Sequence, residues 1–392
     1  MSEANSLWVE RLTLTNFRSY VSASVATDAG PQVIVGANGS GKTNLLEALS
    51  LLSPGTGLRR VPFVDLARAG GDGSFAIAAH AHTLAGPADI GTGLAAGAGT
   101  SARAEGSGRS GRIVRIDGSA QSGSGILADY LEIVWVTPAM DGLFTGPASE
   151  RRRFLDRLIL CFDHSYRTIA GRFERAMTSR NRLLADGVRD NAQLSGFEQV
   201  MAETGVAVAA ARLEAVAAMA AIVQKRRERD PDSAFPWSSF QLVGTIEDDL
   251  ARLSAIEAED AYARTLRETR ERDRAASRTL DGPHRSDLIV EHGPKALEAR
   301  QCSTGEQKAL LLGLVLAHAE LLTERQEGAA PILLLDEITA HLDVHRRGAL
   351  FAEILRLGAQ AWMTGTDAEA FSALAGNAQF WGVEEGKIRS LS

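Results

Sequence analysis

The sequence predicts an α/β fold in which two distant segments form a mixed sheet flanked by helices, with a mainly helical lobe inserted between them. Near the start, an apolar run at 32–35 leads into a glycine-rich segment at 36–43 and then into a helical pattern at 44–49. Near the end, an apolar run at 331–335 stops at two adjacent carboxylates. Residues 156–281 read as helices. Apolar strand runs that alternate with helices favour a parallel sheet with polar groups at its carboxyl edge.

Length and composition favour a soluble protein with more than one unit. At 392 residues the chain is too long for one simple core, and 45% hydrophobic with 23% charged residues is ordinary for a globular protein. The two cysteines, Cys161 and Cys302, are far apart, which excludes a disulfide scaffold and a cysteine zinc site. We find no secretory signal and no stretch of about 18 residues apolar enough to span a bilayer. We therefore expect a cytoplasmic protein without a membrane partner.

The region before and after the glycine-rich segment reads as β-structure. Residues 7–15 alternate and predict a strand, and a second strand is expected at 21–25. Further on, 74–136 looks like a β-rich arm with long mobile loops, such as the Gly/Ala/Ser-rich stretch 91–111. Short strands are expected in this arm at 75–82, 112–116 and 133–136.

The glycine-rich segment fits the phosphate-binding pattern of glycine, four residues, then Gly-Lys-Thr. Its glycines let backbone N–H groups turn toward phosphates, Lys42 reaches the terminal phosphates, and the Thr43 hydroxyl ligates Mg²⁺. The following helix adds the partial positive charge of its N-terminus. Because both the strand and the helix are in place, the sequence predicts binding of a nucleoside triphosphate. The expected nucleotide-binding residues of this loop are Gly36, Ala37, Asn38, Gly39, Ser40, Gly41, Lys42 and Thr43.

The inserted segment reads as a lobe of helices. Residues 198–228 are alanine-rich with apolar stretches, which suits a helix interior. Residues 255–280 carry alternating charges, as on a solvated helix face. Residues 151–191 are net basic, with ten arginines. Pro231 and Pro236 mark breaks between these helices.

Two motifs after the lobe carry chemistry. A serine and a glycine before an apolar helix at 309–322 predict an N-cap with open N–H groups, which is an anion site. The apolar strand at 331–335 ends in Asp336, which should hold Mg²⁺, and Glu337, which should orient and polarise an attacking water. We expect Lys42, Asp336 and Glu337 to be catalytic. The anion site consists of Ser303, Thr304, Gly305, Glu306, Gln307 and Lys308.

These landmarks, in this order, resemble the ATPase heads of the ABC class, and three stretches resemble the RecF family within it. Residues 12–20, Leu-Thr-Leu-Thr-Asn-Phe-Arg-Ser-Tyr, resemble the opening of the SMC and RecF group. The stretch 137–156, with Arg-Arg-Arg-Phe-Leu-Asp, and the stretch 282–288, Gly-Pro-His-Arg-Ser-Asp-Leu, resemble RecF signatures. The chain departs from those signatures at Ala139, Ala148 and Ser286.

The resemblance implies a split P-loop head at 1–155 and 285–392 with a helical lobe at 156–284. It places Arg18 close to the nucleotide, although a surface arginine in a loop is the alternative. It also implies that Thr364 or Thr366 contacts the γ-phosphate. The switch histidine of many ABC ATPases is absent at 365–367, so hydrolysis should be slow. The usual glutamine on Mg²⁺ is absent from 137–156, which leaves that metal contact in doubt.

The ABC resemblance also implies an ATP-dependent homodimer. In this class the anion site 303–308 binds the γ-phosphate of the nucleotide held by the other subunit. The loop of His341, Leu342 and Asp343 should contact that subunit. ATP would then hold the dimer together, and hydrolysis at Glu337 would release it.

For function, the RecF resemblance implies a DNA-repair ATPase. Proteins of this family bind double-stranded DNA near single-strand/double-strand junctions and, with RecR and RecO, promote loading of RecA in gap repair and replication restart. The net charge of −7 disfavours a polyanion partner only on average, because a basic stripe can coexist with it. The DNA-contact candidates, chosen by charge alone, are Arg59, Arg60, Arg151, Arg152 and Arg153.

Three other functions fit parts of the pattern. A transporter ATPase subunit would have a smaller helical insertion and membrane partners. An SMC-like structural protein would have a far longer heptad coiled coil, and the DNA-repair relatives with zinc hooks need Cys-x-x-Cys, which is absent. A nucleotide-gated binding protein with negligible turnover is not separated from an enzyme by these residues.

Overall fold

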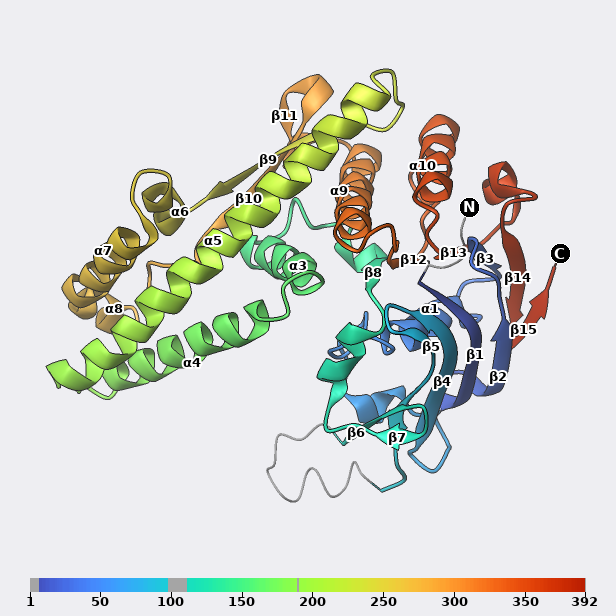
Figure 1. Ribbon diagram of the computed structural model, residues 1–392, viewed down its shortest axis with the longest axis horizontal. Helices are drawn as coiled ribbons and strands as arrows, with labels where there is room; N and C mark the ends of the chain where they lie inside the picture. Colours follow the sequence, from blue (N-terminus) through green and yellow to red (C-terminus); the bar gives the residue numbers. More distant parts are fainter. Residues whose placement is uncertain (1–6, 98–110, 189, 392) are drawn as a thin grey trace. The chain divides into compact units, whose positions relative to one another are not determined.

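The computed structural model describes residues 7–97, 111–188 and 190–391 of the chain. These residues divide into two compact units. The head unit consists of Met1–Asp141, Ser233–Phe235 and Leu311–Ser392, and the lobe unit consists of Gly142–Asp232 and Pro236–Leu310. In Figure 1 the head is blue to teal and red, and the lobe is green to orange.

The boundaries of the units differ from those expected at 155 and 285. Helix α3 (Ala148–Leu160) belongs to the lobe, where it contacts strand β10 (Asp287–His292). Strand β10 in turn pairs with β9 (Ser238–Val243), a lobe strand. Both elements therefore complete the lobe rather than the head.

One sheet of the head has the order β15-β14-β3-β13-β12-β8, with β15 as its antiparallel edge strand. The other five strands pair in parallel, which confirms the expected mixed sheet. Strands β3, β8 and β12 are buried at every position, because a parallel sheet covered on both faces needs continuous apolar runs. The strands are β3 (Gln32–Val35), β8 (Ile133–Val136), β12 (Ile332–Leu335), β13 (Ala361–Gly365), β14 (Gln379–Glu384) and β15 (Lys387–Ser390).

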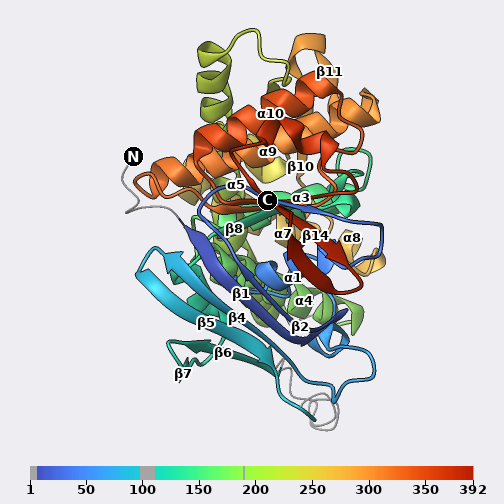
Figure 2. The same cartoon turned by 90° about the vertical axis from the view of Figure 1, so that its right-hand side faces the viewer.

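The second sheet of the head is antiparallel, in the order β2-β1-β4-β5-β6-β7. Figure 2 shows β2, β1, β4 and β5 side by side. Strand β5 was predicted as loop from residue 91 because it is glycine-rich. A side chain at Gly93 would lie 2.3 Å from the carbonyl oxygen of Phe75, so glycine permits the close pairing there. The strands are β1 (Trp8–Phe17), β2 (Tyr20–Ala26), β4 (Phe75–Thr83), β5 (Gly86–Leu94), β6 (Arg112–Ile116) and β7 (Ser119–Ala120).

The strands expected at 75–82, 112–116 and 133–136 are present as β4, β6 and β8, but β8 belongs to the parallel sheet beside β12 and not to the arm. Part of the predicted mobile loop, residues 98–110, lies outside the described residues.

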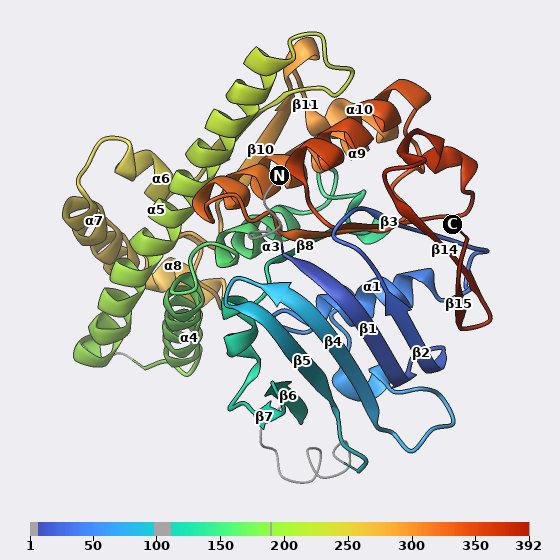
Figure 3. The same cartoon turned by 45° about the vertical axis from the view of Figure 1, so that its right-hand side comes forward.

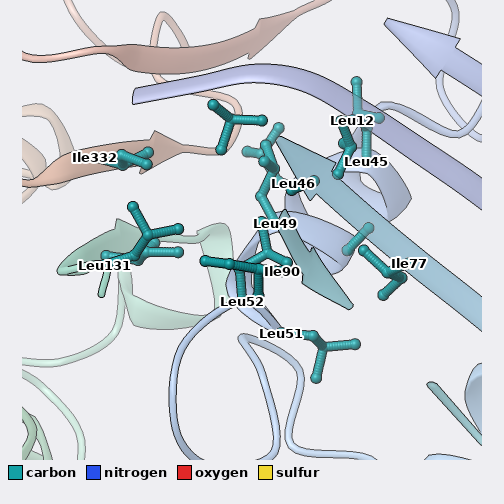
Figure 4. Packing of buried hydrophobic residues seen from close by; sticks show 14 of the residues in the cluster. Leu12, Leu45, Leu46, Leu49, Leu51, Leu52, Ile77, Ile90, Leu131 and Ile332 are labelled. Atoms are coloured by element: carbon teal, nitrogen blue, oxygen red, sulfur yellow. The ribbon is translucent and has the colours of Figure 1, made fainter. Parts of the chain in front are cut away.

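Helix α1 (Lys42–Ser50) lies in the core of the head and connects the two sheets. Its residues Leu45, Leu46 and Leu49 are at most 1% exposed. They pack in one cluster with Leu12, Ile77 and Ile90 of the antiparallel sheet and Ile332 of the parallel sheet, as Figure 4 shows. Figure 3 shows α1 behind the antiparallel strands. Full burial of a leucine contributes about 1.5–3 kcal/mol, so this helix is firmly fixed where the phosphate-binding segment ends.

The remaining elements of the head include α10 (Val344–Leu357), which begins after the second carboxylate motif. Helix α9 (Thr304–Arg325) contributes its first residues to the lobe unit and the rest to the head unit. The short 3-10 helices of the head are η2 (Phe63–Leu66), η3 (Ser124–Asp129), η4 (Pro138–Met140) and η7 (Glu369–Leu374).

The lobe is mainly helical, as predicted, but it also contains a three-stranded antiparallel sheet in the order β11-β10-β9. Strand β9 lies inside the range expected to be helical and was missed. Helices α4 and α5 run side by side along much of their length in Figure 1. The further elements are α4 (Tyr166–Ala185), α5 (Asn191–Arg229), α6 (Thr245–Leu250), α7 (Ala255–Glu268), α8 (Arg270–Ala275), η5 (Gly293–Lys295), β11 (Leu297–Glu298) and η6 (Ala299–Gln301).

Helix α5 corrects the prediction about membrane-spanning stretches. By length and composition it could cross a membrane, with a window of mean hydropathy 2.0 that is 50% buried, and it is the one such helix among the described residues. Its apolar side chains Met201, Ala202, Val206 and Ala209 pack with residues of α4 and α7 in the core of the lobe. The high hydropathy therefore fits a core helix.

A buried ion network corrects the interpretation of the charged lobe helices as solvated faces. Arg180 is fully buried and lies 3.1 Å from Glu198 and 2.8 Å from Asp273, both of which are also buried. Arg270 donates to the same Glu198 at 2.6 Å. These residues connect α4, α5 and α8, so their charges serve packing, and removing one partner would leave a costly unpaired charge.

Candidate nucleotide site

The phosphate-binding segment turns tightly between β3 and α1. Gly39 has φ 81° and Gly41 has φ 118°, a conformation that residues with a side chain rarely adopt. A side chain at Gly36 would lie 2.3 Å from the carbonyl oxygen of Val383. The loop geometry therefore needs glycine at these three positions, as the motif predicts.

Lys42 lies at the start of α1 and is 5% exposed. Its Nζ donates to the carbonyl oxygens of Gly36, at 2.7 Å, and Ala37, at 2.9 Å. Burial lowers the pKa of Lys42, while the nearby carboxylates of Glu337 and Asp336 act in the opposite direction. The ammonium thus spans the loop and lies close enough to both predicted catalytic carboxylates to feel their charge.

Three chain segments meet at Asp336, which is 4% exposed just after β12. The hydroxyl of Thr43 lies 3.0 Å from both of its carboxylate oxygens. The hydroxyl of Thr364, at the end of β13, donates to Oδ1 at 2.7 Å. This is the carboxyl edge of the parallel sheet, where open α/β sheets bind ligands.

The donor atoms suit Mg²⁺. The hydroxyl of Thr43 and the carboxylate of Asp336 are adjacent hard oxygen ligands, which Mg²⁺ prefers. Among the described residues no group of three or more His, Cys, Asp or Glu side chains could hold a metal. In nucleotide sites Mg²⁺ is usually held by one or two protein ligands together with phosphate and water.

Glu337 follows Asp336 in an unusual backbone conformation. Its φ is 49°, and its N–H donates to the hydroxyl of Thr364 at 2.8 Å. A left-handed conformation at a residue other than glycine costs about 1–3 kcal/mol and clusters at functional sites. The strain therefore coincides with the residue predicted to act on the attacking water.

Arg18 forms an ion pair with the buried carboxylate of Glu47, on the helix that follows the phosphate loop. Its guanidinium makes two hydrogen bonds to Glu47, at 2.8 and 2.9 Å, and a third to the carbonyl oxygen of Asp65. Arg59 reaches the same carboxylate at 3.1 Å and the side chain of Asn44 at 2.8 Å. The structure thus brings together two arginines that we expected to have separate roles.

Sequence reasoning missed Glu47, which is 1% exposed. The available signal was a single acid within the apolar pattern of 44–49. A buried carboxylate needs a partner, and two arginines supply one here.

The loop expected to contact a second subunit contains His341, Leu342 and Asp343. His341 is exposed and has φ 66°, whereas Leu342 is buried. The carboxylate of Asp343 accepts from the N–H of Arg346 at 2.9 Å and caps α10. The pKa of Asp343 is lowered by this backbone hydrogen bond. The geometry shows the cap, and the dimer contact stays a prediction.

The anion-site motif lies at the start of α9. Glu306 accepts from the N–H of Ser303 at 3.1 Å and pairs with Lys295 at 2.5 Å, and these interactions lower its pKa to about 2. The amide of Gln307 donates to the carbonyl oxygen of Cys302 at 2.9 Å. Ser303 and Thr304 are exposed. Ser303 and Lys42 belong to different units, so the paired site across two subunits stays a prediction.

The DNA candidates chosen by charge separate into two groups. Arg60 and Arg153 are exposed, and Arg152 is half-buried with a hydrogen bond to the carbonyl oxygen of Ser286 at 2.6 Å. Arg151 is different, because it pairs with Asp287 through two bonds of 2.7 and 2.8 Å and donates to three backbone carbonyls. The guanidinium of Arg151 therefore makes its hydrogen bonds within the lobe. We assign Arg151 a structural role and no longer propose it as a DNA contact.

The stretch 282–288, whose roles were open, joins the elements of the lobe. The carbonyl oxygen of Pro283 and the hydroxyl of Ser286 both accept from Arg212 of α5. Arg212 also pairs with Asp156 of α3 at 2.8 Å. Asp287, the residue after Ser286, forms an ion pair with Arg151 of α3. The motif therefore fixes α3 and α5 to β10.

The fold and this site define a P-loop ATPase with an ABC-type head. Three features occur along the chain in the order typical of that class. They are the phosphate loop before α1, the signature motif at the start of α9, and the carboxylate pair after β12.

Comparison with known proteins identifies the family. The chain matches the RecF/RecN/SMC N-terminal domain family over residues 8–387. It is 51% identical over 380 residues to the DNA replication and repair protein RecF of Mesorhizobium japonicum, covering 97% of each chain. The chain belongs to the RecF family.

Solved structures share the fold. The recombination mediator protein RecF-ATPrS of the RecFOR pathway matches with a TM-score of 0.82 at 20% identity, covering 100% of both chains. The Smc head domain of Pyrococcus furiosus, bound to the C-terminal domain of ScpA, matches with a TM-score of 0.54 at 18% identity, covering 98% of this chain and 96% of that one. These likenesses confirm the predicted ABC-type head.

Proposed function

We propose that this protein is an ATP-dependent DNA-binding protein of recombinational gap repair and replication restart. The observation that carries the proposal is the meeting of Thr43, Asp336, Glu337 and Thr364 at one edge of the sheet. Such a site can detect a nucleotide and hydrolyse it. The family relationship supports the task, because the relatives that match over the full chain are DNA replication and repair proteins.

In the proposed reaction Lys42 binds the terminal phosphates of ATP, and Thr43 and Asp336 hold Mg²⁺. The ion would screen the phosphate charge and align the phosphoryl group when bound. Glu337 accepts a hydrogen bond from the attacking water and orients it toward the γ-phosphate. Hydrolysis is slow, because no histidine occupies 365–367.

ATP is proposed to join two copies of the chain. The exposed N-terminus of α9 at Ser303 offers N–H groups and dipole charge to the γ-phosphate held by the other copy. Only ATP carries that phosphate, so the dimer distinguishes ATP from ADP by a direct contact. Asp343 and its loop contribute to the same interface.

DNA is proposed to bind through exposed arginines. Arg59 is partly exposed, and Arg60 and Arg153 are exposed. Within 151–191, helix α4 also exposes Arg167, Arg172, Arg175 and Arg182 along its length. Contacts of arginine with phosphate predict binding that is independent of base sequence and falls steeply with salt. Double-stranded DNA at a gap is the proposed substrate, RecR is the proposed partner with RecO, loading of RecA is the proposed outcome, and the cytoplasm is the proposed compartment.

Sedimentation velocity with and without Mg-ATP, repeated with a short gapped duplex, tests this function. We expect a monomer that dimerises with ATP and remains longer on the duplex when it does. Lys42→Arg should lose both responses, because the terminal phosphates lose their fitted cation, and ADP provides the matched ligand control. A monomer that ignores both ATP and DNA would instead favour a transporter-type or partner-dependent ATPase.

A further inference from the structure

Thr364 occupies a position between the two halves of the nucleotide site. It lies at the end of β13, which pairs with β3 on one side and with β12 on the other. In this register Thr364 pairs with Ile34 of the strand that leads to the phosphate loop, and Met363 pairs with Leu335, the residue before Asp336. Its side chain is fully buried.

The hydroxyl of Thr364 is used by both catalytic carboxylate residues. It donates to Oδ1 of Asp336 at 2.7 Å and accepts from the N–H of Glu337 at 2.8 Å. A hydroxyl has a single proton, and here Thr364 donates that proton in its hydrogen bond to Oδ1 of Asp336. A phosphate oxygen can only accept hydrogen bonds, so Thr364 could contact the γ-phosphate only by releasing Asp336.

We propose that Thr364 is a positioning residue that orients Asp336 and Glu337 together, in place of the γ-phosphate contact expected from sequence. The proposal rests on the roles given above to Asp336 and Glu337. One bond fixes the rotation of the Asp336 carboxylate, which also accepts from the hydroxyl of Thr43. The other bond holds the peptide that enters Glu337 at φ 49°.

The two bonds give Thr364 a consequence for chemistry. Without the acceptor oxygen, the strained backbone at Glu337 is free to relax, and its carboxylate leaves the place from which it orients water. Without the donor, Asp336 turns and presents a poorer ligand to Mg²⁺. Residues that hydrogen-bond a metal ligand typically change metal affinity or activity by about 10–100-fold when removed.

The test compares Thr364→Val, which keeps the shape and removes the hydroxyl, with Thr364→Ser, which keeps the hydroxyl. Thr27→Val is the matched control. Thr27 is also buried in the head, and its hydroxyl donates to the carbonyl oxygen of Val9 at 2.5 Å and accepts from Gln360 at 3.1 Å. Steady-state ATP hydrolysis gives kcat and KM, and thermal unfolding reports whether each variant folds.

We expect Thr364→Val to lower kcat by about 10–100-fold, with Thr364→Ser restoring most of it. A second readout needs no turnover, namely the affinity for a fluorescent ATP analogue in Mg²⁺ and in EDTA. Thr364→Val should leave the affinity in EDTA unchanged and reduce the gain that Mg²⁺ produces. Thr27→Val should change neither the turnover nor the nucleotide affinity.

Three results would overturn the proposal. An unchanged kcat in Thr364→Val would show that the bridge has no catalytic effect, and an equal fall in Thr27→Val would assign the effect to lost stability. A fall of affinity in EDTA that matches the fall in kcat would make Thr364 a direct nucleotide ligand. Glu337→Gln is measured in parallel to test the catalytic role of the site separately from the positioning role of Thr364. Normal turnover in Glu337→Gln would reject the proposed function of the site itself.

Discussion

Arg18 and Glu47 form a two-bonded ion pair, with nitrogen–oxygen distances of 2.8 and 2.9 Å, that joins the β1–β2 turn to the helix of the phosphate loop. Arg18 has φ 53°, so the turn is tight, and the next residue lies against Gly41, where a side chain would be 2.8 Å from the hydroxyl oxygen of Ser19. The pair therefore holds a strained turn against the phosphate loop. Arg59 adds a more exposed bond to the same carboxylate.

Glu47→Gln should reduce the free energy of unfolding by about 1–3 kcal/mol, because Arg18 loses a charged acceptor in a largely buried place. Arg59→Ala is the control. The Arg59 side chain is 38% exposed, so its loss should cost at most about 1 kcal/mol. Urea unfolding of both variants gives the comparison. Equal losses for the two variants would show that the buried carboxylate does not depend on Arg18.

Glu337→Gln should bind ATP and remain dimeric on DNA. The amide keeps the size of the side chain, and the backbone bond to Thr364 does not involve it. It no longer has a carboxylate to polarise water, so hydrolysis is the step that fails. Dissociation from a gapped duplex, followed by fluorescence after ATP is chased with ADP, measures this. Release as fast as that of the unmodified protein would remove Glu337 from its assigned role.

Ser303→Arg should block ATP-driven dimerisation while each monomer still binds ATP. The side chain at 303 is exposed at the start of α9, where a long cation would occupy the proposed place of the partner's γ-phosphate. Sedimentation with Mg-ATP measures the dimer, and a fluorescent ATP analogue measures monomer binding. Ser303→Ala is the size-reduced control and should still dimerise. Intact dimers of Ser303→Arg would contradict the site shared between two subunits.

Acid should remove the contribution of Glu306 to stability. Lys295 and the N–H of Ser303 lower the pKa of Glu306 from its ordinary 4.5 to about 2. Because the pKa in the folded protein is the lower one, the stabilisation is complete above about pH 4.5 and is lost as the pH falls toward 2. Unfolding midpoints of Glu306→Gln and the unmodified protein should differ at pH 7 and converge from pH 4.5 downward. A constant difference across this range would assign the effect to packing.

The phosphate loop could be predicted because its determinants are local. The glycines, Lys42 and Thr43 lie within eight consecutive residues, and the strand and helix that flank them have simple burial patterns. The carboxylate pair was predictable for the same reason, since it ends an apolar strand. The likeness of the fold to solved RecF and Smc heads confirms the class that these motifs predicted.

The bridge at Thr364 could not be predicted, because it depends on strand order. Only the placement of β13 beside β12 brings Thr364 to Asp336, and no spacing along the chain encodes it. The sequence marked Thr364 as important through the resemblance but gave it a phosphate contact. Its buried hydroxyl makes hydrogen bonds to the carboxylate of Asp336 and the N–H of Glu337.

Charge was the least reliable signal. Arg151 and Arg180 lie in the arginine-rich range 151–191, whose charge favoured DNA contacts, yet both pair with carboxylates from other segments of the lobe. A run of arginines does not show which side chains will find an internal partner. The strands β5 and β9 were missed for a related reason, since their glycine and serine content hides the pairing that holds them.

The order of the parallel sheet has a consequence for synthesis. Strand β3, which leads into the phosphate loop, lies between β13 and β14 among the described strands, and both of these follow residue 360. Contacts between such distant segments form slowly, since a long loop must close first. The two lobe segments, Gly142–Asp232 and Pro236–Leu310, are both synthesised before β13. The phosphate loop is thus synthesised long before the two strands that pair with β3.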